Sequence, residues 1–394
     1  MTRPLHLALI GIGGYGNHYV TALLDAPPEA GVRIVSAVDP APQACRRLAE
    51  LADRGVPVLP GIEALGGAAD IDLAVISTPI HLHAPHTCWA LQRGAHVLCE
   101  KPLCATLDEI NRMVAARNRA DRQVAIGYQW SFSDAIQRLK ADILAGRFGR
   151  PRRLRSITLW PRGSAYYSRN AWAGMQRDPG GRWVLDSPVN NACAHHLHNM
   201  LYVLGPERTL SATPMQVTAE LYRANPIENY DSAALRVLTA DGAELLFYVA
   251  HAVAQERGPE FVYEFERATV TYSQLDGATL RATLTDGTQI DYGQPDDGRQ
   301  RKLWAVIDAI RNGTPVPCGI EAASAHTRCV WAACASQPAI TDFPEPLIRI
   351  CHQPQNQIQW VEGLAETLGQ CYDAGCLPSE LGIAWAKPGM PISV

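Results

Sequence analysis

Residues 5–16, LHLALIGIGGYG, decide the fold of the first part of this chain. A short apolar run typical of a buried strand leads into three glycines in the G-x-G-x-x-G spacing, and a helical pattern follows. In such a unit the first glycine permits a tight turn, the second lets the backbone approach a pyrophosphate, and the third allows close packing of helix on strand. The phosphates are expected at the helix N-terminus. The predicted cofactor-binding residues of this turn are Gly11, Gly13, Gly14, Tyr15 and Gly16.

An acidic residue follows the next apolar run, VRIVSAVD, which ends at Asp39. An acid at this distance from the glycine turn is placed to bind the ribose hydroxyls of a dinucleotide. Its carboxylate would repel a 2′-phosphate, and the nearest arginines, Arg46 and Arg47, lie one to two helical turns further along the chain. We therefore expect NAD as the cofactor in preference to NADP.

The pattern of apolar residues differs between the first and the second part of the chain. Short β-branched runs alternate with helical patterns up to about residue 130, which predicts a doubly wound parallel sheet of the Rossmann type. A helix is expected near 134–145, followed by longer alternating runs with Asp-Gly turns at 241, 276 and 286, and then by helices over 299–312 and 320–336. The predicted fold is α/β: a Rossmann domain over 1–130 and an α+β domain with a large, mostly antiparallel open sheet over 131–394.

Composition favours a small-molecule partner. The 394 residues include 35 Lys+Arg and 39 Asp+Glu without a basic block, which argues against nucleic acid or an anionic membrane surface as the ligand. The first apolar segment is soon broken by glycines and is too short for a secretory or membrane-spanning segment, so a cytoplasmic location is expected. The 11 scattered cysteines are interpreted as reduced.

The run from Leu73 to Leu103, LAVISTPIHLHAPHTCWALQRGAHVLCEKPL, carries the most specific motif. A strand ends in a Thr-Pro turn, a helix follows, and the run closes on G-x-H-V-x-x-E-K-P. Together with the glycine turn, this resembles the Gfo/Idh/MocA family of nicotinamide-dependent sugar and cyclitol oxidoreductases. The second domain matches that family in outline, through GGRWVLD, the Leu-Gly pair at 204–205 and the helix near 304–312.

The resemblance implies a Rossmann domain followed by an open sheet that covers the cofactor and often builds dimers or tetramers, so a homodimer or homotetramer is expected. It also places Lys101 beside the nicotinamide. An ammonium there would lower the pKa of the reacting hydroxyl and stabilise a developing alkoxide. Further cofactor-binding residues implied by the motif are Thr78, Pro79, His83, Glu100 and Lys101. For His83, and for His81 beside it, capping of the following helix is an equally good interpretation.

Three histidines gather in VNNACAHHLHNMLY, from Val189 to Tyr202. On one continuous helix Asn191, His195 and His198 would share a face. A zinc site of Cys193, His195 and His198 is disfavoured, because Cys193 would project to another side and no spaced acid or C-x-x-C pair completes a ligand shell. No metal is therefore expected.

The resemblance supplies another role, since the family pattern is D-x-x-x-H-x-x-D followed by an apolar run and Leu-Gly. Counting back from Gly205 places His195 on the acid/base histidine, Asn191 on the first aspartate and His198 on the second. A histidine with an ordinary pKa near 6.5 is able to take a hydroxyl proton as hydride leaves the same carbon. Counting forward from Gly180 instead makes Asp186 the first aspartate, which predicts an insertion between 186 and 194. The predicted catalytic residues are Lys101, His195, Asn191 and Asp186.

Aromatic and polar residues interleave between Trp160 and Trp183, in WPRGSAYYSRNAWAGMQRDPGGRW. Such a mixture suits a sugar, because ring faces stack on C–H patches while amides and guanidinium groups bind hydroxyls. An acidic group such as a carboxylate, sulfonate or phosphate is an alternative ligand for Arg162 and Arg169. The candidate substrate-binding residues are Tyr166, Tyr167, Arg169, Asn170, Trp172 and His198.

Three functions are compatible with these residues. The leading hypothesis is an NAD-dependent dehydrogenase that oxidises a secondary hydroxyl of a sugar, glycoside or cyclitol, with His195 and Lys101 in acid/base roles. The segment inserted near residue 186 favours a glycoside or disaccharide over a free monosaccharide. The first alternative is a redox-neutral glycoside hydrolase. Such an enzyme oxidises the glycoside transiently, eliminates the aglycone, adds water and returns the hydride to the sugar. The second is a non-catalytic NAD-binding sensor, which Lys101 and His195 together disfavour.

Overall fold

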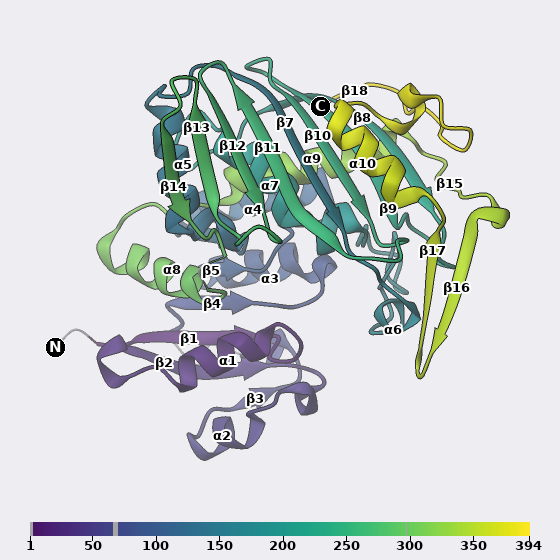
Figure 1. Ribbon diagram of the computed structural model, residues 1–394. Helices are drawn as coiled ribbons and strands as arrows, with labels where there is room; N and C mark the ends of the chain where they lie inside the picture. Colours follow the sequence, from purple (N-terminus) through teal and green to yellow (C-terminus); the bar gives the residue numbers. More distant parts are fainter. Residues whose placement is uncertain (1–2, 66–69, 297) are drawn as a thin grey trace. The chain divides into compact units, whose positions relative to one another are not determined.

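The computed structural model describes residues 3–65, 70–296 and 298–394 and divides them into two compact units (Figure 1). Unit 1 comprises Met1–Phe132 and Asp297–Ala323, and unit 2 comprises Ser133–Asp296 and Ser324–Val394. The first boundary lies near the predicted one, but a single split at residue 130 does not describe the return of the segment after Asp297 to unit 1. The physical reason is a helix of that segment whose apolar face packs into unit 1.

Unit 1 is built on one parallel sheet of six strands in the order β3-β2-β1-β4-β5-β6. This order confirms the predicted Rossmann topology, whose switch point lies between β1 and β4. The strands are β1 (Leu5–Ile10), β2 (Val32–Val38), β3 (Val58–Leu59), β4 (Leu73–Ile76), β5 (His96–Cys99) and β6 (Val124–Ile126). The helices are α1 (Gly16–Leu24), α2 (Leu48–Asp53), α3 (Ile80–Gln92), α4 (Leu107–Ala120) and α8 (Arg301–Asn312).

The Rossmann topology brings the motif residues to one edge of the sheet. Gly11 follows β1, Asp39 follows β2, Thr78 lies two residues after β4, and Glu100 follows β5. Because all these strands are parallel, their carboxyl ends lie at the same edge, which is where open α/β sheets bind ligands. Residues distant in sequence are thereby collected into one candidate cofactor site.

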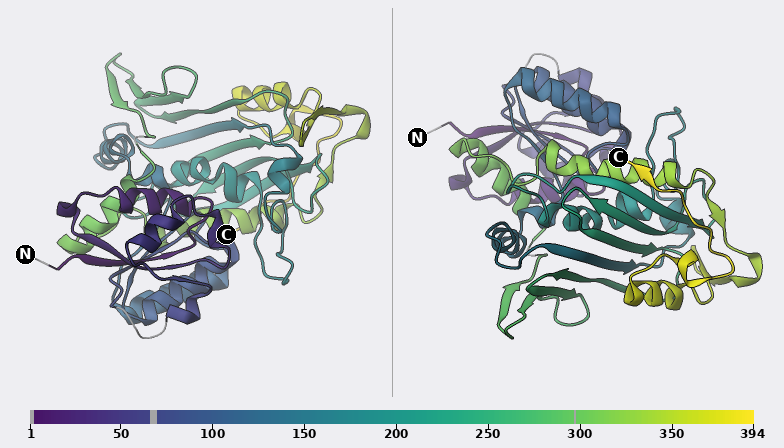
Figure 2. Two further views of the ribbon diagram at one scale, coloured as in Figure 1. Left: turned by 90° about the horizontal axis from the view of Figure 1, so that it is seen from below. Right: turned by 90° about the horizontal axis from the view of Figure 1, so that it is seen from above.

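Unit 2 contains a ten-stranded, mostly antiparallel sheet, as predicted (Figure 2). The main path runs β14-β13-β12-β11-β7-β10-β9-β8-β15, and β18 pairs with β8. The β7–β10 and β8–β15 pairs are parallel. The strands are β7 (Pro151–Leu159), β8 (Pro214–Arg223), β9 (Ser232–Thr239), β10 (Glu244–Ala250), β11 (Arg257–Phe265), β12 (Ala268–Ser273), β13 (Leu280–Leu284), β14 (Gln289–Gly293), β15 (Thr341–Asp342) and β18 (Ile392–Ser393).

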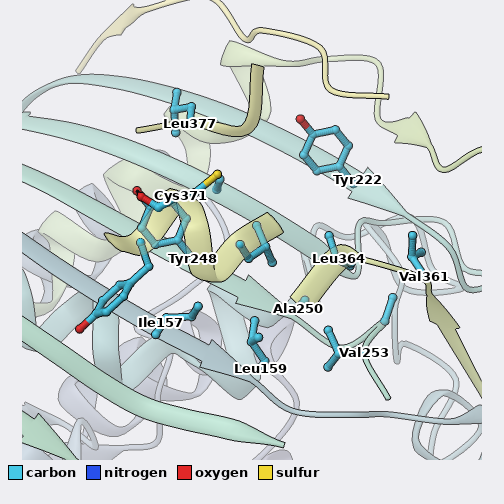
Figure 3. Close-up of a cluster of buried hydrophobic side chains, with 14 of the residues drawn as sticks. Ile157, Leu159, Tyr222, Tyr248, Ala250, Val253, Val361, Leu364, Cys371 and Leu377 are labelled. Atoms are coloured by element: carbon cyan, nitrogen blue, oxygen red, sulfur yellow. Dashed lines mark hydrogen bonds between the residues drawn. The ribbon is translucent and has the colours of Figure 1, made fainter. Parts of the chain in front are cut away.

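Helices cover both faces of this sheet (Figure 1). The helices that lie in unit 2 are α5 (Asp134–Leu144), α6 (Ser164–Tyr167), α7 (Ala194–Val203) and α10 (Leu364–Ala374), and α9 (Ile320–Ser336) begins in unit 1 and ends in unit 2. On the β7 strand, Ile157 and Leu159 face α10, where they join a buried cluster with Tyr248, Leu364 and Cys371 (Figure 3). Burying a leucine or isoleucine side chain contributes about 1.5–3 kcal/mol, so the C-terminal segment is part of the fold of unit 2.

A separate two-stranded hairpin projects beside the large sheet (Figure 1). It consists of β16 (Ile348–Gln353) and β17 (Asn356–Val361), whose outer residues are exposed. Its attachment to α6 is described below. No helix among residues 3–65, 70–296 and 298–394 is long and apolar enough to cross a bilayer.

Candidate active site

The glycine turn of unit 1 requires its glycines for two different reasons. Gly11 has φ of +87°, and a Cβ there would lie 2.9 Å from the backbone carbonyl carbon and oxygen of Ser77. A Cβ at Gly16 would lie 2.2 Å from the carbonyl oxygen of Gly11. Only glycine suits position 11, because of its positive φ and the nearby backbone of Ser77. Only glycine suits position 16, because the backbone of Gly11 lies so close. At Gly14, with φ of +48°, nothing lies within 4 Å of the added Cβ, so this position is open.

Asp39 lies against this turn. Its Oδ2 accepts hydrogen bonds from the backbone N–H groups of Ile12 (2.9 Å) and Gly13 (3.1 Å), and its Oδ1 accepts one from Ala41 (2.9 Å). The carboxylate is half-buried, and three backbone donors hold it at the end of β2. This places a fixed negative charge beside the turn, in the position expected of a group that recognises a ribose.

The Thr-Pro and Glu-Lys-Pro turns are joined by His83. Its buried ring lies between two carbonyl oxygens, with Nδ1 2.7 Å from that of Pro102 and Nε2 2.9 Å from that of Thr78. Burial lowers the pKa of His83, although both carbonyls favour the protonated ring. The predicted alternatives were a place in the cofactor groove or a helix cap. The ring instead ties two turns together, so any part it plays in cofactor binding acts through Thr78 and Pro102.

Three other residues of these turns, Thr78, Pro79 and Lys101, are half-buried, whereas His81 is buried. Pro79 is the N-cap residue of α3, and the Thr78 hydroxyl lies 3.3 Å from Nδ1 of His86. Lys101 is half-buried and precedes a cis peptide bond to Pro102. His81 is 8% exposed and belongs to the first turn of α3.

Glu100 is held by a buried network that the sequence analysis missed. Its Oε1 accepts from the Tyr19 hydroxyl (2.5 Å) and from Nζ of Lys302, and its Oε2 accepts from the backbone N–H of Lys101 (3.2 Å). Lys302 is 1% exposed and also donates to the carbonyl oxygen of Gly127 (3.1 Å). Its ammonium lies 4.5 Å from the centre of the Tyr15 ring, within the glycine turn. One lysine of α8 therefore links the glycine turn to the residue before Lys101.

A signal for Lys302 was present in the sequence. Lys302 stands four residues before Val306 and seven before Ala309, on the buried stripe of α8. A charged side chain on an apolar helix face is buried only when it is paired, so this position could have indicated a partner in the core. The identity of that partner, Glu100, required the tertiary structure.

In unit 2 the segment before α7 departs from one continuous helix. Residues Pro188–Ala192 form a π-helical turn that begins after Ser187, whose side chain accepts from the N–H of Asn190. The α-helical register begins only at Ala194, after Cys193. His195 and His198 keep their predicted three-residue spacing within α7, but the continuous helix that would extend their face to Asn191 is not present, because Asn191 belongs to the π turn.

The π turn brings Asn191 to Asp186 instead. The Nδ2 of Asn191 donates to Oδ1 of Asp186 (2.7 Å). The Oδ2 of Asp186 accepts from the backbone N–H of Gly174 (2.7 Å) and from Arg169 (3.2 Å). Asp186 is 2% exposed, so these donors replace water around its charge. The two residues that competed for the family's aspartate position are thus hydrogen-bonded neighbours.

The three histidines differ in their surroundings. His195 is half-buried at the second position of α7. His196 is 5% exposed, with its ring 5.7 Å from that of Trp160. His198 is 1% exposed and stacks on Tyr202 at 5.6 Å, and burial, with His326 and Lys140 nearby, lowers its pKa well below the ordinary value. His198 therefore lies in the core of unit 2, where its ring packs on Tyr202, and its predicted contact with substrate stays a prediction.

The predicted substrate segment forms an aromatic–arginine cluster, defined here as Trp160, Arg162, Tyr166, Tyr167, Arg169, Trp172 and His251. The guanidinium carbon of Arg169 lies 3.8 Å from the centre of the Tyr166 ring and 5.4 Å from that of Trp172. The Tyr167 hydroxyl lies 3.2 Å from Nδ1 of His251, which sequence reasoning did not identify.

Burial and the charge of Asp186 raise the pKa of Tyr166 to about 12, so its hydroxyl is a neutral donor. Asn170 uses its side-chain oxygen within its own turn, accepting from the N–H of Trp172 (3.1 Å).

No group of three or more His, Cys, Asp or Glu side chains in the described part of the chain is arranged to hold a metal ion. Of the two histidines that a zinc site would need, His195 is half-buried and His198 lies in the core.

Comparison with known proteins supports the assignment of unit 1. Residues 5–128 match the family model described as "Oxidoreductase family, NAD-binding Rossmann fold", the Gfo/Idh/MocA family. The chain is 36% identical over 149 residues to the 1-carboxy-3-chloro-3,4-dihydroxycyclo hexa-1,5-diene dehydrogenase of Comamonas testosteroni, a match that covers 38% of this chain and 37% of that protein.

Two further comparisons extend over both units. Inositol 2-dehydrogenase of Mycolicibacterium gilvum is 25% identical over 359 residues, which cover 86% of this chain and 92% of that protein. The structure of an oxidoreductase from Agrobacterium radiobacter, solved with NAD+, L-tartaric acid and magnesium, has a TM-score of 0.69 at 21% identity and covers 85% of this chain and 96% of its own. The glycine turn, the Glu100-Lys101-Pro102 motif and the family model together identify residues 5–128 as an NAD-binding Rossmann domain of the Gfo/Idh/MocA type, and the solved structure shows a similar fold over both units.

Proposed function

We propose that this chain is an NAD-dependent dehydrogenase that oxidises a secondary hydroxyl of a sugar, glycoside or cyclitol. The observation that carries the proposal is the fixed setting of Glu100, which buried Lys302 and Tyr19 hold at the carboxyl end of β5, directly before Lys101. The relatives are named as dehydrogenases of a dihydroxylated ring that carries a carboxy group and of inositol, which supports a small cyclic polyol as the substrate class.

The chemistry divides between the residues of this chain. When bound, the nicotinamide supplies the hydride acceptor. The half-buried His195 takes the proton of the reacting hydroxyl, and the Lys101 ammonium stabilises the negative charge that develops on its oxygen. Asp186 orients Asn191 and Arg169, whose remaining donors bind neighbouring hydroxyls of the substrate.

NAD is favoured over NADP because the fixed carboxylate of Asp39 lies beside the glycine turn and would repel a 2′-phosphate. The cytoplasmic location and the homodimer or homotetramer expected from the sequence remain predictions, and so does the preference for a glycoside.

The test is incubation of the purified protein with NAD+ or NADP+ and a panel of inositols, free sugars, sugar acids and aryl glycosides. Accumulation of NADH together with an oxidised product supports the dehydrogenase. Release of aglycone without net NADH indicates the redox-neutral hydrolase, and tight NAD binding without turnover of any polyol indicates a sensor. Tighter binding of NADP than of NAD would overturn the role given to Asp39.

A further inference from the structure

Arg162 is a charged side chain of the aromatic–arginine cluster without an acidic partner. Its Nη1 donates to the carbonyl oxygen of Pro161 (3.1 Å), and its Nε is buried and makes no hydrogen bond within the described residues. No carboxylate of residues 3–65, 70–296 or 298–394 forms an ion pair with it. The side chain is only partly exposed, so part of its hydration is lost without compensation by a negative charge.

The neighbouring arginine differs in this respect. Arg169 pairs with the buried carboxylate of Asp186 at 3.2 Å, so its charge is already balanced. Asp231, whose charge acts on Tyr167 of the cluster, is fully buried and accepts from the backbone N–H groups of Ala224 and Asn225, the Asn225 amide and the Ser232 hydroxyl. Both acids are therefore saturated by other donors, and the positive charge of Arg162 is the one left uncompensated.

The walls around Arg162 are suited to a planar, singly charged group. Its guanidinium carbon lies 5.3 Å from the centre of the Tyr166 ring and 5.7 Å from that of Trp160. The His251 ring beside it is neutral at physiological pH, because burial and the two arginines lower the pKa of His251 to about 3. The surroundings thus offer the guanidinium of Arg162, with its one positive charge, and the hydroxyl of Tyr166. These two donors match a carboxylate better than a doubly charged phosphate.

We propose that Arg162 binds a carboxylate of the substrate, with the Tyr166 hydroxyl as a second donor, so that the substrate is a sugar acid or a carboxylated cyclitol. This inference rests on the proposed function, which places the substrate at the cluster. It goes further by naming Arg162, and not Arg169, as the residue that binds the charged group, and by naming an acid, and not a neutral polyol, as the substrate.

Binding and turnover are measured separately to test it. The probes are D-glucuronate against D-glucose and D-galacturonate against D-galactose, titrated into the protein saturated with NADH and followed by calorimetry and tryptophan fluorescence. The variants are Arg162→Ala and Arg162→Lys. The matched control is Arg177→Ala, which removes a guanidinium of the same segment that stacks on Trp183 at 3.5 Å.

The wild-type protein and the control should bind each acid about 10- to 100-fold more tightly than its neutral partner, as expected for a charge-assisted pair. Arg162→Ala should abolish this preference and Arg162→Lys should retain part of it, while NADH affinity stays unchanged in both. Neutral sugars that bind as tightly as the acids, or no saturable binding of either acid, would overturn the inference. Acid binding through Arg162 without oxidation by NAD+ would leave the inference standing and refute the proposed dehydrogenase. Oxidation of neutral polyols alone would support the dehydrogenase and refute the inference about the carboxylate.

Discussion

The carboxylate of Asp186 accepts a hydrogen bond from the side-chain amide of Asn191, with Oδ1 and Nδ2 2.7 Å apart. Asn191 lies five positions after Asp186, within the π turn that folds its side chain back onto the acid. Counting from either end of the family pattern gives a different residue for the aspartate position, and the structure brings both residues to one place. We therefore expect them to act as a unit, in which the carboxylate of Asp186 supplies the charge and holds the side-chain amide of Asn191 in place.

Asp186→Asn is predicted to lower turnover about 10- to 100-fold, because it replaces the charged acceptor of three donors with a neutral amide of the same shape. Asn191→Ala should have a smaller effect, since Asp186 keeps its other two donors. Steady-state kinetics on the best substrate of the panel measures both. Asp178→Asn is the matched control, because Asp178 is also buried and paired with an arginine, Arg182, in the same segment. A control as damaging as Asp186→Asn would mean that the effect is structural.

Lys101→Ala and His195→Ala are each predicted to lower kcat by about 10²–10⁴-fold and to leave NAD affinity nearly unchanged, because general acid/base groups act mainly on the transition state. His196→Ala is the comparison, since His196 is the neighbour of His195 and packs its ring against Trp160. It should change turnover far less. An essential His196 beside a dispensable His195 would contradict the assignment of the acid/base histidine.

Lys302→Met is predicted to destabilise the protein by about 3–5 kcal/mol, because it leaves the carboxylate of Glu100 buried without its cation. It should also weaken NAD binding, since the lysine lies against the Tyr15 ring of the glycine turn. Chemical denaturation and nucleotide titration measure the two effects. The double variant Lys302→Met/Glu100→Gln should recover part of the stability, because it removes the unpaired charge. The exposed Lys387→Met serves as the control, and an equal loss there would refute the pairing argument.

The parts of the fold that were predictable depend on local pattern. The glycine turn and the strands around it follow from apolar runs and glycine spacing, both of which act within a few residues. The β8 strand is harder to predict, because it begins at Pro214 and carries a buried acid, Glu220, which accepts hydrogen bonds from the Ser379 and Tyr222 hydroxyls. Its acceptability depends on residues far along the chain, which no strand pattern reveals.

The candidate site divides in the same way. Asp39 could be proposed from its distance to the glycine turn, and Lys101 from a contiguous motif, because both signals lie in the sequence itself. The Asp186–Asn191 pair, the partner of Lys302 and the contact of Tyr167 with His251 are products of tertiary packing. The π turn, which no pattern in the sequence indicated, interrupts the continuous helix that the shared face of Asn191 and His195 assumed.

Acidification is predicted to destabilise the protein between about pH 6.5 and pH 3, through buried histidines that stay neutral when folded. The pKa of His251 is lowered to about 3, whereas the unfolded chain takes up the proton near pH 6.5. In that window the unfolded state binds more protons, so the free energy of unfolding falls as pH falls, by about 1.4 kcal/mol per pH unit for one such group. Urea denaturation at pH 7 and pH 5 measures the drop.

His251→Gln should shrink that difference between pH 7 and pH 5 by about 2 kcal/mol, because the titrating group is gone. The exposed His352→Gln on the hairpin should leave the difference as it is in the wild type. An unchanged drop in His251→Gln would show that His251 does not carry this part of the acid sensitivity.

The hairpin of β16 and β17 is predicted to hold in place Tyr166 and Tyr167, the two tyrosines that we expect to contact substrate. The side-chain oxygen of Asn356 accepts from the N–H of Ala165 (3.1 Å), the Ser164 hydroxyl accepts from the N–H of Gln357 (2.8 Å), and a β-bridge joins Gly163 to Ile358. These contacts fix the first turn of α6, the short helix that carries Tyr166 and Tyr167. A two-stranded hairpin has little stability of its own, so the attachment orders both partners.

Asn356→Ala removes the acceptor at the start of α6, and loss of such a cap typically costs about 1 kcal/mol. If the hairpin positions the tyrosines, KM should rise about fivefold while kcat and the unfolding midpoint change little, since one kcal/mol in substrate binding corresponds to about that factor. Asn356→Asp, which keeps an oxygen acceptor, should restore most of the affinity. Gln353→Ala, an exposed position on the opposite strand of the hairpin, is the control and should behave like the wild type. A fall in kcat without a change in KM, or a similar rise in KM for the control, would show that the hairpin does not act through the tyrosines.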